Sequence, residues 1–437
     1  MKFPGKRKNQ HFFPVKDRDR LAFVKDEAFG DFHRVSRRDV YMVGIDQVLV
    51  DIEVHVKEDF LNQYELIKGQ SHHLGEEAFE NIYQSLIGHS MYIFAGGAVG
   101  NTLHNYSILS EDHSVILGAI NKNITVGDYS YKYLCTTSSL VDLSFLQPCD
   151  APMGRALCLV TPDKERTFVI GPGCMNDLSI DSIPEDLVAQ AAGLMLSAYH
   201  LRNPQKPLYH ASLKAIEIAK KNHVPVIFSM GTSDLCRAHQ DQFLDFIKQN
   251  VSILAMNEDE AVALTNCQDP LLAGEFLLDL VDMVMITLGA KGLYLCAHVD
   301  EKNARETKRD LVSGAIHNFN RHEYSRAQRK QDCQKPIKIY THINPFMGGP
   351  GEILNTNGAG DAALAALLHD LAANAYHRRI LPHSPKHQAS YLTYSSISQI
   401  SKYCNRVSYE ILHQNSPRLI RALPQKEDVL EEAYWDL

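Results

Sequence analysis

A chain of 437 residues, 45% of them hydrophobic and 22% charged, is long enough for one large or two ordinary globular domains. Its formal net charge of -8 argues against non-specific nucleic-acid binding as the main task. No run approaches the roughly 18 apolar residues of a membrane span. No apolar segment follows the basic start of the chain, so the sequence predicts neither a membrane protein nor a secretory signal.

The nine cysteines are dispersed and form no CxxC pair. This pattern predicts free thiols in a reducing, cytoplasmic location. The 21 histidines form no HExxH or similar pair, so a metal held by histidines is not expected.

Residues 1–40 form a polar segment that carries both charges and several phenylalanines, and we interpret it as an N-terminal arm packed on the body of the protein. An arm that binds a partner or covers a site is the alternative. Residues 41–437 are then one domain. It begins with the apolar segment from Tyr41 to Asp46, a predicted strand that ends in an acid. Asp46 faces the ligand crevice if this strand is parallel to its neighbours; otherwise it is a turn or capping residue.

Residues 92–95 predict a strand that runs into Gly96 and Gly97, and Asn101 lies just before a predicted helix at 102–109. Such a loop lets the backbone approach a ligand, although a tight turn is an equal alternative. It is no Walker A motif, because no Gly-Lys-Ser/Thr follows. The amide of Asn101 can donate and accept hydrogen bonds, as a sugar hydroxyl requires.

Two segments outside this pattern predict a small second sheet. Residues 48–56 alternate like a half-exposed strand, and residues 155–170 resemble a hairpin. Together they predict a β lid over about residues 47–57 and 150–175.

From about residue 185 strands and helices alternate, which predicts an α/β fold with a mostly parallel central sheet and helices on both faces. Ligands bind at the carboxyl ends of such strands. Asn257 and Glu260 lie at one such end and can hold a solvated Mg²⁺, although the same residues also suit a helix start. The polar and basic stretch at about 298–345 is predicted to be a surface insertion, with an oligomer contact or an anion site as alternatives.

The segment from Asn355 to Asp361 follows an irregular stretch, residues 347–351, and leads into an alanine- and leucine-rich helix. Its two glycines and one alanine, residues 358–360, therefore stand where unpaired N–H groups and the helix dipole favour a phosphate. Asp361 in the first turn is a poor phosphate ligand but a good proton acceptor. This combination predicts phosphoryl transfer to a hydroxyl.

A Rossmann dinucleotide site is excluded because the glycines fall late in the chain and no acid follows at the required distance. An α/β-hydrolase is disfavoured because no GxSxG motif is present.

Four motifs occur in one order: Asp46, Gly96-Gly97 with Asn101, Asn257 with Glu260, and Gly358 to Asp361. Together they resemble the ribokinase-like (PfkB) carbohydrate kinases over about residues 41–415. The resemblance extends to both ends of the chain and is closest to purine nucleoside kinases of that family. It implies a ribokinase-like fold and phosphorylation of the 5′-hydroxyl of inosine and guanosine in purine salvage, with ATP as co-substrate and Mg²⁺ as cofactor.

The resemblance also implies a role for each matching residue. Asp361 would be the catalytic base, and the N–H groups of Gly358, Ala359 and Gly360 would form the anion hole. The ribose hydroxyls would be bound by Asp46, Gly96, Gly97 and Asn101. Glu260 would hold the metal, and the nucleotide side would comprise Asn257, Thr287, Gly289, Gly292, Thr356 and Asn405. The neutral Asn355 and Asn357 depart from the family motif and leave activation by K⁺ open.

The alternatives are another PfkB kinase, for adenosine or a free sugar, and a non-catalytic nucleoside-binding regulator. A binder has no need of a base, so Asp361 favours an enzyme. The sequence predicts small-molecule partners without nucleic acid or membrane, and it leaves a homo-oligomer open.

Overall fold

The computed structural model describes residues 23–25, 32–34, 40–346 and 353–423. Most of the predicted N-terminal arm lies outside these residues, apart from the short antiparallel pair β1 (Phe23–Lys25) and β2 (Phe32–Arg34). The irregular stretch at 347–351 and the last residues of the chain also lie outside them.

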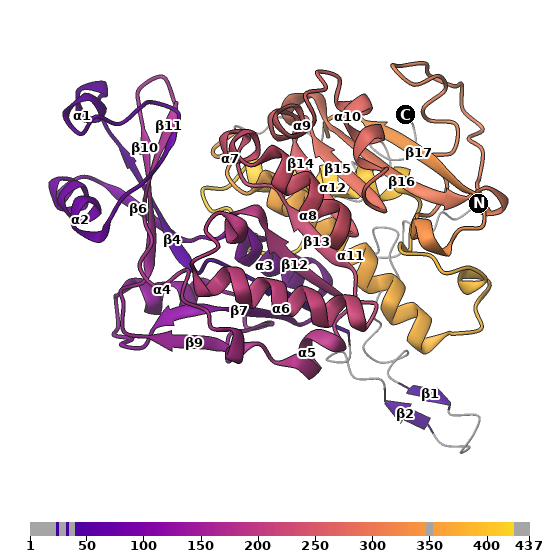
Figure 1. Ribbon diagram of the computed structural model, residues 1–437, viewed down its shortest axis with the longest axis horizontal. Coiled ribbons are helices and arrows are strands. Elements are labelled where there is room, and N and C mark those ends of the chain that lie inside the picture. Colours follow the sequence, from indigo (N-terminus) through magenta and orange to yellow (C-terminus); the bar gives the residue numbers. More distant parts are fainter. Residues whose placement is uncertain (1–22, 26–31, 35–39, 347–352, 424–437) are drawn as a thin grey trace.

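A large sheet forms the centre of the fold (Figure 1). Its strand order is β17-β16-β15-β14-β13-β12-β3-β7-β8, and β9 also pairs with β7. Only the pairs β15·β16 and β16·β17 are antiparallel, so the predicted, mostly parallel sheet is confirmed. The strands are β3 (Met42–Ile45), β7 (Ser114–Asn121), β8 (Val141–Asp142), β9 (Leu146–Cys149), β12 (Gly193–Ser197), β13 (Val226–Ser229), β14 (Ile253–Asn257), β15 (Met283–Thr287), β16 (Leu293–Asp300) and β17 (Pro336–Ile343).

Helices cover both faces of this sheet, because successive side chains of a strand point to opposite faces. In β12, Met195 joins one hydrophobic core while Leu194 and Leu196 join the other. The first core contains α3 (Ala98–Ser110), α11 (Ala359–Ile380) and α12 (Ile397–Leu412). The second lies under α5 (Glu185–Ala189), α6 (Pro207–Lys221), α7 (Ser233–Ala238), α8 (Gln240–Asn250), α9 (Glu258–Thr265) and α10 (Pro270–Leu277).

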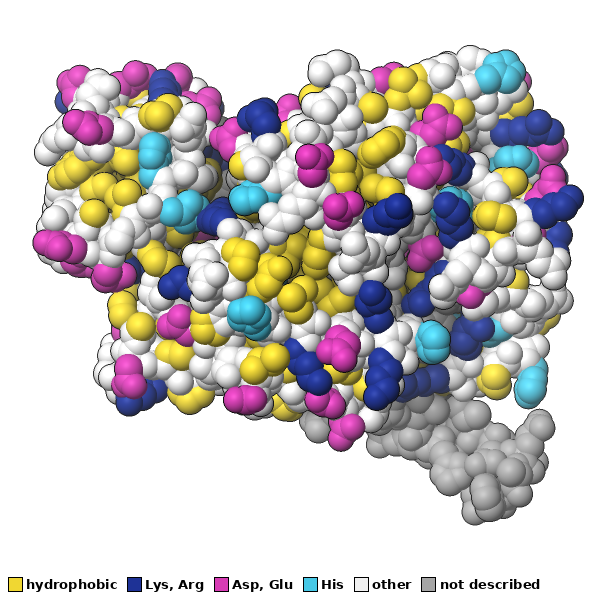
Figure 2. All heavy atoms as spheres, in the orientation of Figure 1, with side chains coloured by type: hydrophobic (Ala, Val, Ile, Leu, Met, Phe, Trp, Pro, Cys, Tyr) yellow, Lys and Arg dark blue, Asp and Glu magenta, His cyan; other side chains and the backbone are white. Residues whose placement is uncertain are grey.

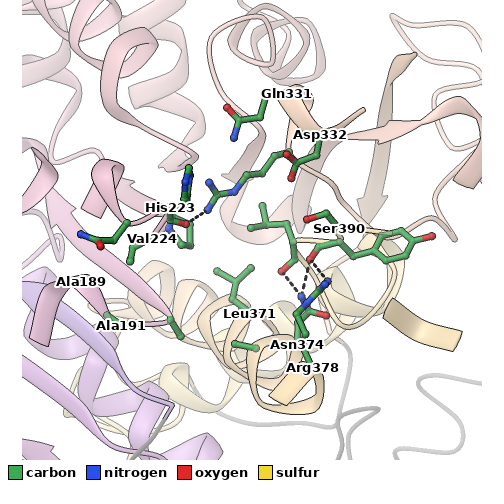
Figure 3. A pocket seen from close by; sticks show the side chains of 17 residues that line it. Ala189, Ala191, His223, Val224, Gln331, Asp332, Leu371, Asn374, Arg378 and Ser390 are labelled. Atoms are coloured by element: carbon green, nitrogen blue, oxygen red, sulfur yellow. Dashed lines mark hydrogen bonds between the residues drawn. The ribbon is translucent and has the colours of Figure 1, made fainter. Parts of the chain in front are cut away.

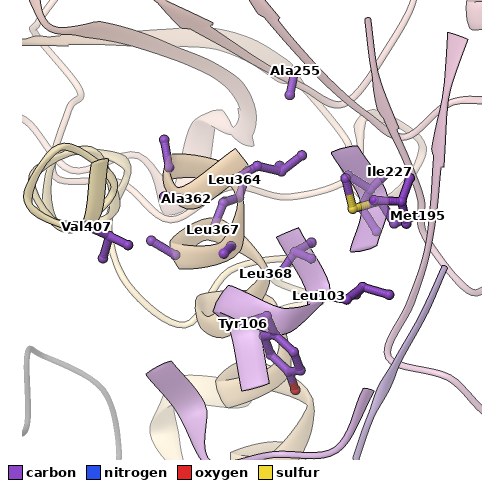
Figure 4. Close-up of a cluster of buried hydrophobic side chains, with 14 of the residues drawn as sticks. Leu103, Tyr106, Met195, Ile227, Ala255, Ala362, Leu364, Leu367, Leu368 and Val407 are labelled. Atoms are coloured by element: carbon purple, nitrogen blue, oxygen red, sulfur yellow. The ribbon is translucent and has the colours of Figure 1, made fainter. Parts of the chain in front are cut away.

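The first core is built around α11. In Figure 4, Leu364, Leu367 and Leu368 of this helix lie between Leu103 of α3 and Val407 of α12. Alanines occupy much of the rest of α11, which lets the two neighbouring helices approach it closely. The N-terminus of α11, which carries the predicted site, is therefore held by a buried helix.

A second sheet of five strands stands apart from the main one (Figure 1). It contains the predicted hairpin, now seen as the antiparallel pair β10 and β11, and the predicted strand at 48–56 as β4. Its order is β5 (Ser71–His73), β11 (Arg166–Gly171), β10 (Gly154–Val160), β4 (Leu49–His55) and β6 (Met91–Ala95). In Figure 2 this sheet and its helices form a lobe that a hollow separates from the main body. Its action as a lid stays a prediction.

Short helices pack around the second sheet: α1 (Glu58–Gln63), α2 (Glu76–Ser85) and α4 (Tyr129–Thr136). Arg155 of β10 is buried and ties α2 to the sheet. Its guanidinium bonds to Glu76 and Glu80 and lies 4.5 Å from the centre of the Phe79 ring.

The predicted insertion at 298–345 is shorter in the structure, because its two ends lie in strands β16 and β17 of the main sheet. The irregular part is residues 301–335. Strand β17 is an edge strand with lysine and histidine among its apolar residues, which made it look like part of a basic loop. The insertion is anchored by the buried Arg326, which donates to the Thr393 carbonyl at 2.9 Å and to Asn374 of α11 at 2.9 Å.

Among the described residues, no helix has the length and apolar character needed to cross a membrane. All nine cysteines are free, as predicted.

The packing around α11 makes a prediction about stability. Leu367 is 0% exposed in the first core, so Leu367→Ala should lower the free energy of unfolding by ~2–5 kcal/mol through lost burial and a cavity. Val126 is 85% exposed, so Val126→Ala is the control and should change the free energy of unfolding by less than about 0.5 kcal/mol. Urea unfolding followed by circular dichroism measures both; equal effects would contradict the packing.

Candidate active site

The N-terminus of α11 is shaped by glycine. Gly358 precedes the helix with φ of 77°, a left-handed conformation that favours glycine. A Cβ at this position would lie 2.6 Å from the Cβ of Pro417, so a side chain is also excluded by space. Gly360 is exposed, and a Cβ there would meet nothing within 4 Å. The Ala359 N–H donates to the Thr356 carbonyl at 3.4 Å, and the open space beside Gly360 leaves room for an anion at this helix start.

Asp361 lies in the first turn of α11 and is half-buried. Its Oδ2 accepts a hydrogen bond from Nδ2 of Asn101 at 3.3 Å, which joins two residues 260 positions apart. Burial raises the pKa of Asp361 to about 7, and the charges of Asp46 and Asp51 act in the same direction. The hydrogen bond from Asn101 opposes this shift. At neutral pH this carboxyl group therefore exchanges its proton readily.

Asp46 follows β3 at the carboxyl edge of the main sheet and is 2% exposed. Its Oδ2 has no hydrogen-bond partner among the described residues. Burial raises its pKa to about 7, against the charge of Arg418 and the N–H groups of Gly100 and Val99. An unpartnered, buried carboxylate oxygen at this edge is suited to accept hydrogen bonds from a ligand's hydroxyl groups.

The glycine loop before α3 makes room for these acids. Gly97 has φ of 91°, and a Cβ there would lie 2.3 Å from Oδ2 of Asp46. A Cβ on Gly96 would lie 2.6 Å from Oδ2 of Asp51. Both glycines therefore let the backbone approach the carboxyl groups of Asp46 and Asp51, and its approach to a ligand stays a prediction.

Arg418 was missed by the sequence analysis, although it is the main cation behind these acids. It is 4% exposed and donates to Oδ1 of Asn101 at 2.9 Å and to the Gly96 carbonyl at 3.1 Å. It lies 317 residues from Asn101 in a segment without regular structure, so no local pattern marks it. Arg418 fixes the amide of Asn101 so that its Nδ2 points at Asp361.

Asn257 and Glu260 form a capping box at the start of α9, so their structural role as a helix start is confirmed. Glu260 is 6% exposed, and both its oxygens accept hydrogen bonds from Asn257 at 3.0 Å. Burial raises the pKa of Glu260 to about 7, and the charge of Asp361 raises it further. The carboxylates of Glu260 and Asp361 repel each other. A divalent cation bound near them would stabilise the ionised form of both.

The predicted nucleotide-side residues gather beside Asn257. Thr287 ends β15 and pairs in register with Asn257 of β14. Gly289 and Gly292 form the next turn, and a Cβ on Gly292 would lie 1.8 Å from the Ile343 carbonyl. Asn405 of α12 donates to the carbonyl of Asn344, which follows β17. The structure therefore brings these segments to the same edge of the sheet.

The segment 355–357 is bound by Arg166 of the second sheet. The guanidinium donates to Oδ1 of Asn355 at 2.9 Å, to Oγ1 of Thr356 at 3.1 Å and to Oδ1 of Asn357 at 2.7 Å. Arg166, also unrecognised in the sequence, thus connects β11 to the loop that precedes α11.

A separate cavity of about 480 Å³ lies at the opposite edge, where β12 and β13 begin (Figure 3). Leu371, Asn374 and Arg378 of α11 line it, and it contains none of the predicted site residues. Two arginines bind carbonyl groups at this cavity: Arg378 donates to Ala389 at 3.4 Å, and Arg329 donates to His223, just after α6, at 2.7 Å. The polar side chains of the candidate site belong instead to the carboxyl edge.

Comparison with known proteins identifies the family of the chain. The chain is 50% identical over 439 residues to guanosine-inosine kinase of Escherichia coli K12, with 100% of each chain covered. The adenosine kinase structure from Sinorhizobium meliloti has a TM-score of 0.65 at 18% identity and covers 89% of this chain and 97% of its own. A probable sugar kinase from Rhizobium etli CFN 42 has a TM-score of 0.66 at 18% identity, with 91% and 99% covered.

The two solved structures share the fold, as expected for a ribokinase-like protein. A model of the pfkB family of carbohydrate kinases matches residues 126–314. Together with the full-length relative, this match shows that the chain belongs to the pfkB carbohydrate kinase family.

Proposed function

We propose that the protein transfers the γ-phosphoryl group of ATP to the 5′-hydroxyl of guanosine and inosine, forming GMP and IMP. The observation that carries this proposal is the half-buried Asp361, held by Asn101 beside the open N-terminus of α11. The 50% identity to guanosine-inosine kinase supports the choice of nucleosides.

In this proposal Asp361 accepts the proton of the 5′-hydroxyl as the oxygen attacks the phosphorus. The N–H groups of Gly358, Ala359 and Gly360 stabilise the charge on the transferred phosphoryl, and ADP leaves in line. A pKa of about 7 suits a base that works at neutral pH, since the ionised form is present and still accepts a proton.

The other end of the ribose is bound by Asp46, whose unpartnered oxygen accepts from the 2′- or 3′-hydroxyl. Gly96, Gly97 and Asn101 complete this part of the site. Contacts at two positions of the ribose fix its orientation. The attack of the hydroxyl on the phosphorus then takes place between groups that are already in position.

ATP would lie over the turn formed by Gly289 and Gly292, with Thr287, Thr356 and Asn405 beside it. Glu260, fixed by Asn257, would hold Mg²⁺ through coordinated water, since both of its oxygens are occupied by the capping box. When bound, this ion supplies charge neutralisation between the phosphates. The second sheet would act as a lid, and Arg166 would hold it against the loop that precedes α11.

The test of the proposed function is consumption of ATP with inosine, guanosine, adenosine or ribose. Turnover that is fastest with the first two nucleosides supports it, and turnover with adenosine or ribose alone would replace it with another kinase activity. Binding of nucleosides without turnover would indicate a regulator. A comparison of KCl with NaCl at fixed ionic strength tests whether a monovalent cation acts near Asn355 and Asn357.

The role of Asp361 predicts the behaviour of one isosteric variant. Asp361→Asn should lower kcat by ~10²–10⁴-fold because the base is lost, while the Kd for guanosine, measured by calorimetry, stays close to the wild-type value. Asp245→Asn, an exposed change on α8, is the control and should leave kcat unchanged. A near-normal kcat in Asp361→Asn would show that another group accepts the proton.

The raised pKa values predict the pH dependence. A raised carboxyl pKa means that the ionised form is lost as pH falls through about 7, so kcat/KM for guanosine should fall about tenfold or more per pH unit below 7. Asp46 and Glu260 titrate in the same range and make the fall steeper.

Asn101→Leu removes the hydrogen bond that lowers the pKa of Asp361, so the midpoint of this profile should move to higher pH. Measurement of kcat/KM for guanosine from pH 5.5 to 8.5 in both proteins tests this prediction. A profile without a fall at low pH would contradict a carboxylate base.

A further inference from the structure

Arg202 lies immediately after the short turn Ala198–Leu201 that follows β12. Its Nη1 lies against the imidazole of His73 in β5 of the second sheet, 3.1 Å from Nδ1, and donates to the one ring nitrogen that carries no proton. No residue of the described chain forms a carboxylate ion pair with Arg202, and the side chain is half-buried. A partly desolvated arginine without an acidic partner has donors left for an acceptor from outside the protein.

His73 acts on Arg202 as an acceptor. Partial desolvation and the charge of Arg202 lower the pKa of His73 to about 4. The imidazole is therefore neutral at pH 7 and can accept a hydrogen bond from the guanidinium. This contact joins the segment that follows β12 to the second sheet and holds the guanidinium against β5.

The strand order places the start of the segment that carries Arg202 beside the proposed ribose site. Because β12 pairs with β3, the segment that follows β12 lies beside the segment that follows β3, where Asp46 is found. The guanidinium carbon of Arg202 lies 5.1 Å from the centre of the Tyr199 ring. Burial raises the pKa of Tyr199, and the charges of Glu260 and Asp361 raise it further. The Tyr199 ring therefore lies within electrostatic range of Asp361.

We propose that Arg202, positioned by His73 and Tyr199, reads the O6/N7 edge of the purine base and so selects 6-oxopurine nucleosides against adenosine. The inference rests on the proposed function, since it assumes that Asp46 and Asp361 hold the ribose. With the ribose held there, the base attached to C1′ would extend towards the segment that carries Arg202.

The chemistry of the base decides the direction of selectivity. Guanine and hypoxanthine present two acceptors, O6 and N7, which match two parallel N–H groups of a guanidinium. Adenine presents an amino group in place of O6, so two sets of donors would face each other. A contact of this kind discriminates between bases by about 10- to 100-fold.

The experiment compares kcat/KM for guanosine, inosine and adenosine in the wild type, Arg202→Met and Arg321→Met. Arg321 is an exposed arginine that pairs with Glu306, so its variant is a matched control and should behave like the wild type. Arg202→Met should lower kcat/KM for guanosine and inosine by about 10- to 100-fold, mainly through KM, and leave adenosine unchanged or improved. Retained turnover of adenosine also shows that the variant is folded.

A second measurement needs no variant. The wild type should use 7-deazaguanosine less well than guanosine because N7 is missing, and in Arg202→Met the ratio of the two should approach one. His73→Ala should weaken the preference for 6-oxopurines less than Arg202→Met does, and His73→Gln should restore part of it.

Equal losses for all three nucleosides in Arg202→Met, or equal use of 7-deazaguanosine and guanosine by the wild type, would overturn the inference. If the wild type prefers guanosine and Arg202→Met keeps that preference, the inference about Arg202 is overturned and the proposed function stands. A wild type that uses adenosine as well as guanosine overturns the proposed function together with it.

Discussion

The hydrogen bond between Asn101 and Asp361 is the contact on which the rest of the site depends. It joins the first turns of α3 and α11, two helices that pack together in the same core. Each helix begins after a glycine with positive φ, Gly97 and Gly358, so each start is free of a side chain where a ligand has to approach. A shift of either helix would separate Asp361 from the amide that orients it.

This arrangement concentrates negative charge. Asp46, Asp361 and Glu260 each have a pKa raised to about 7, and burial is the largest cause in every case. Arg418 is the buried cation that lowers the pKa of the first two, and no group of three or more metal-ligating side chains occurs in the described part of the chain. Such a site is electrostatically incomplete by itself. Phosphates with an accompanying cation would complete it, because they bring positive charge to the acids and negative charge to the helix start.

Two arginines connect the second sheet with the main body at different places. Arg166 reaches from β11 to the loop before α11, and Arg202 reaches from the end of β12 to β5. Both contacts join the second sheet to segments of the main body, and both are polar. Polar contacts of partly exposed side chains can break and form again with little loss of buried apolar area, which is compatible with a second sheet that opens and closes over the substrates.

Elements with continuous apolar runs, such as β12 to β15, could be predicted because strands buried on both faces leave that pattern in the sequence. The same holds for Asp361, Asn101, Asn257 and Asp46, each of which adjoins a regular element whose start or end is visible. Strand β17 was not predicted, since an edge strand carries lysine and histidine like a loop. Arg418, Arg166 and Arg202 were not recognised either, because the hydrogen-bond partners of their guanidinium groups are between 129 and 322 residues away. The sequence by itself therefore determined which groups could carry out the chemistry, through local patterns of glycine, acid and helix start. Only the tertiary structure decided their protonation, orientation and cationic partners, because burial and charge depend on segments that meet only when the sheets and helices pack.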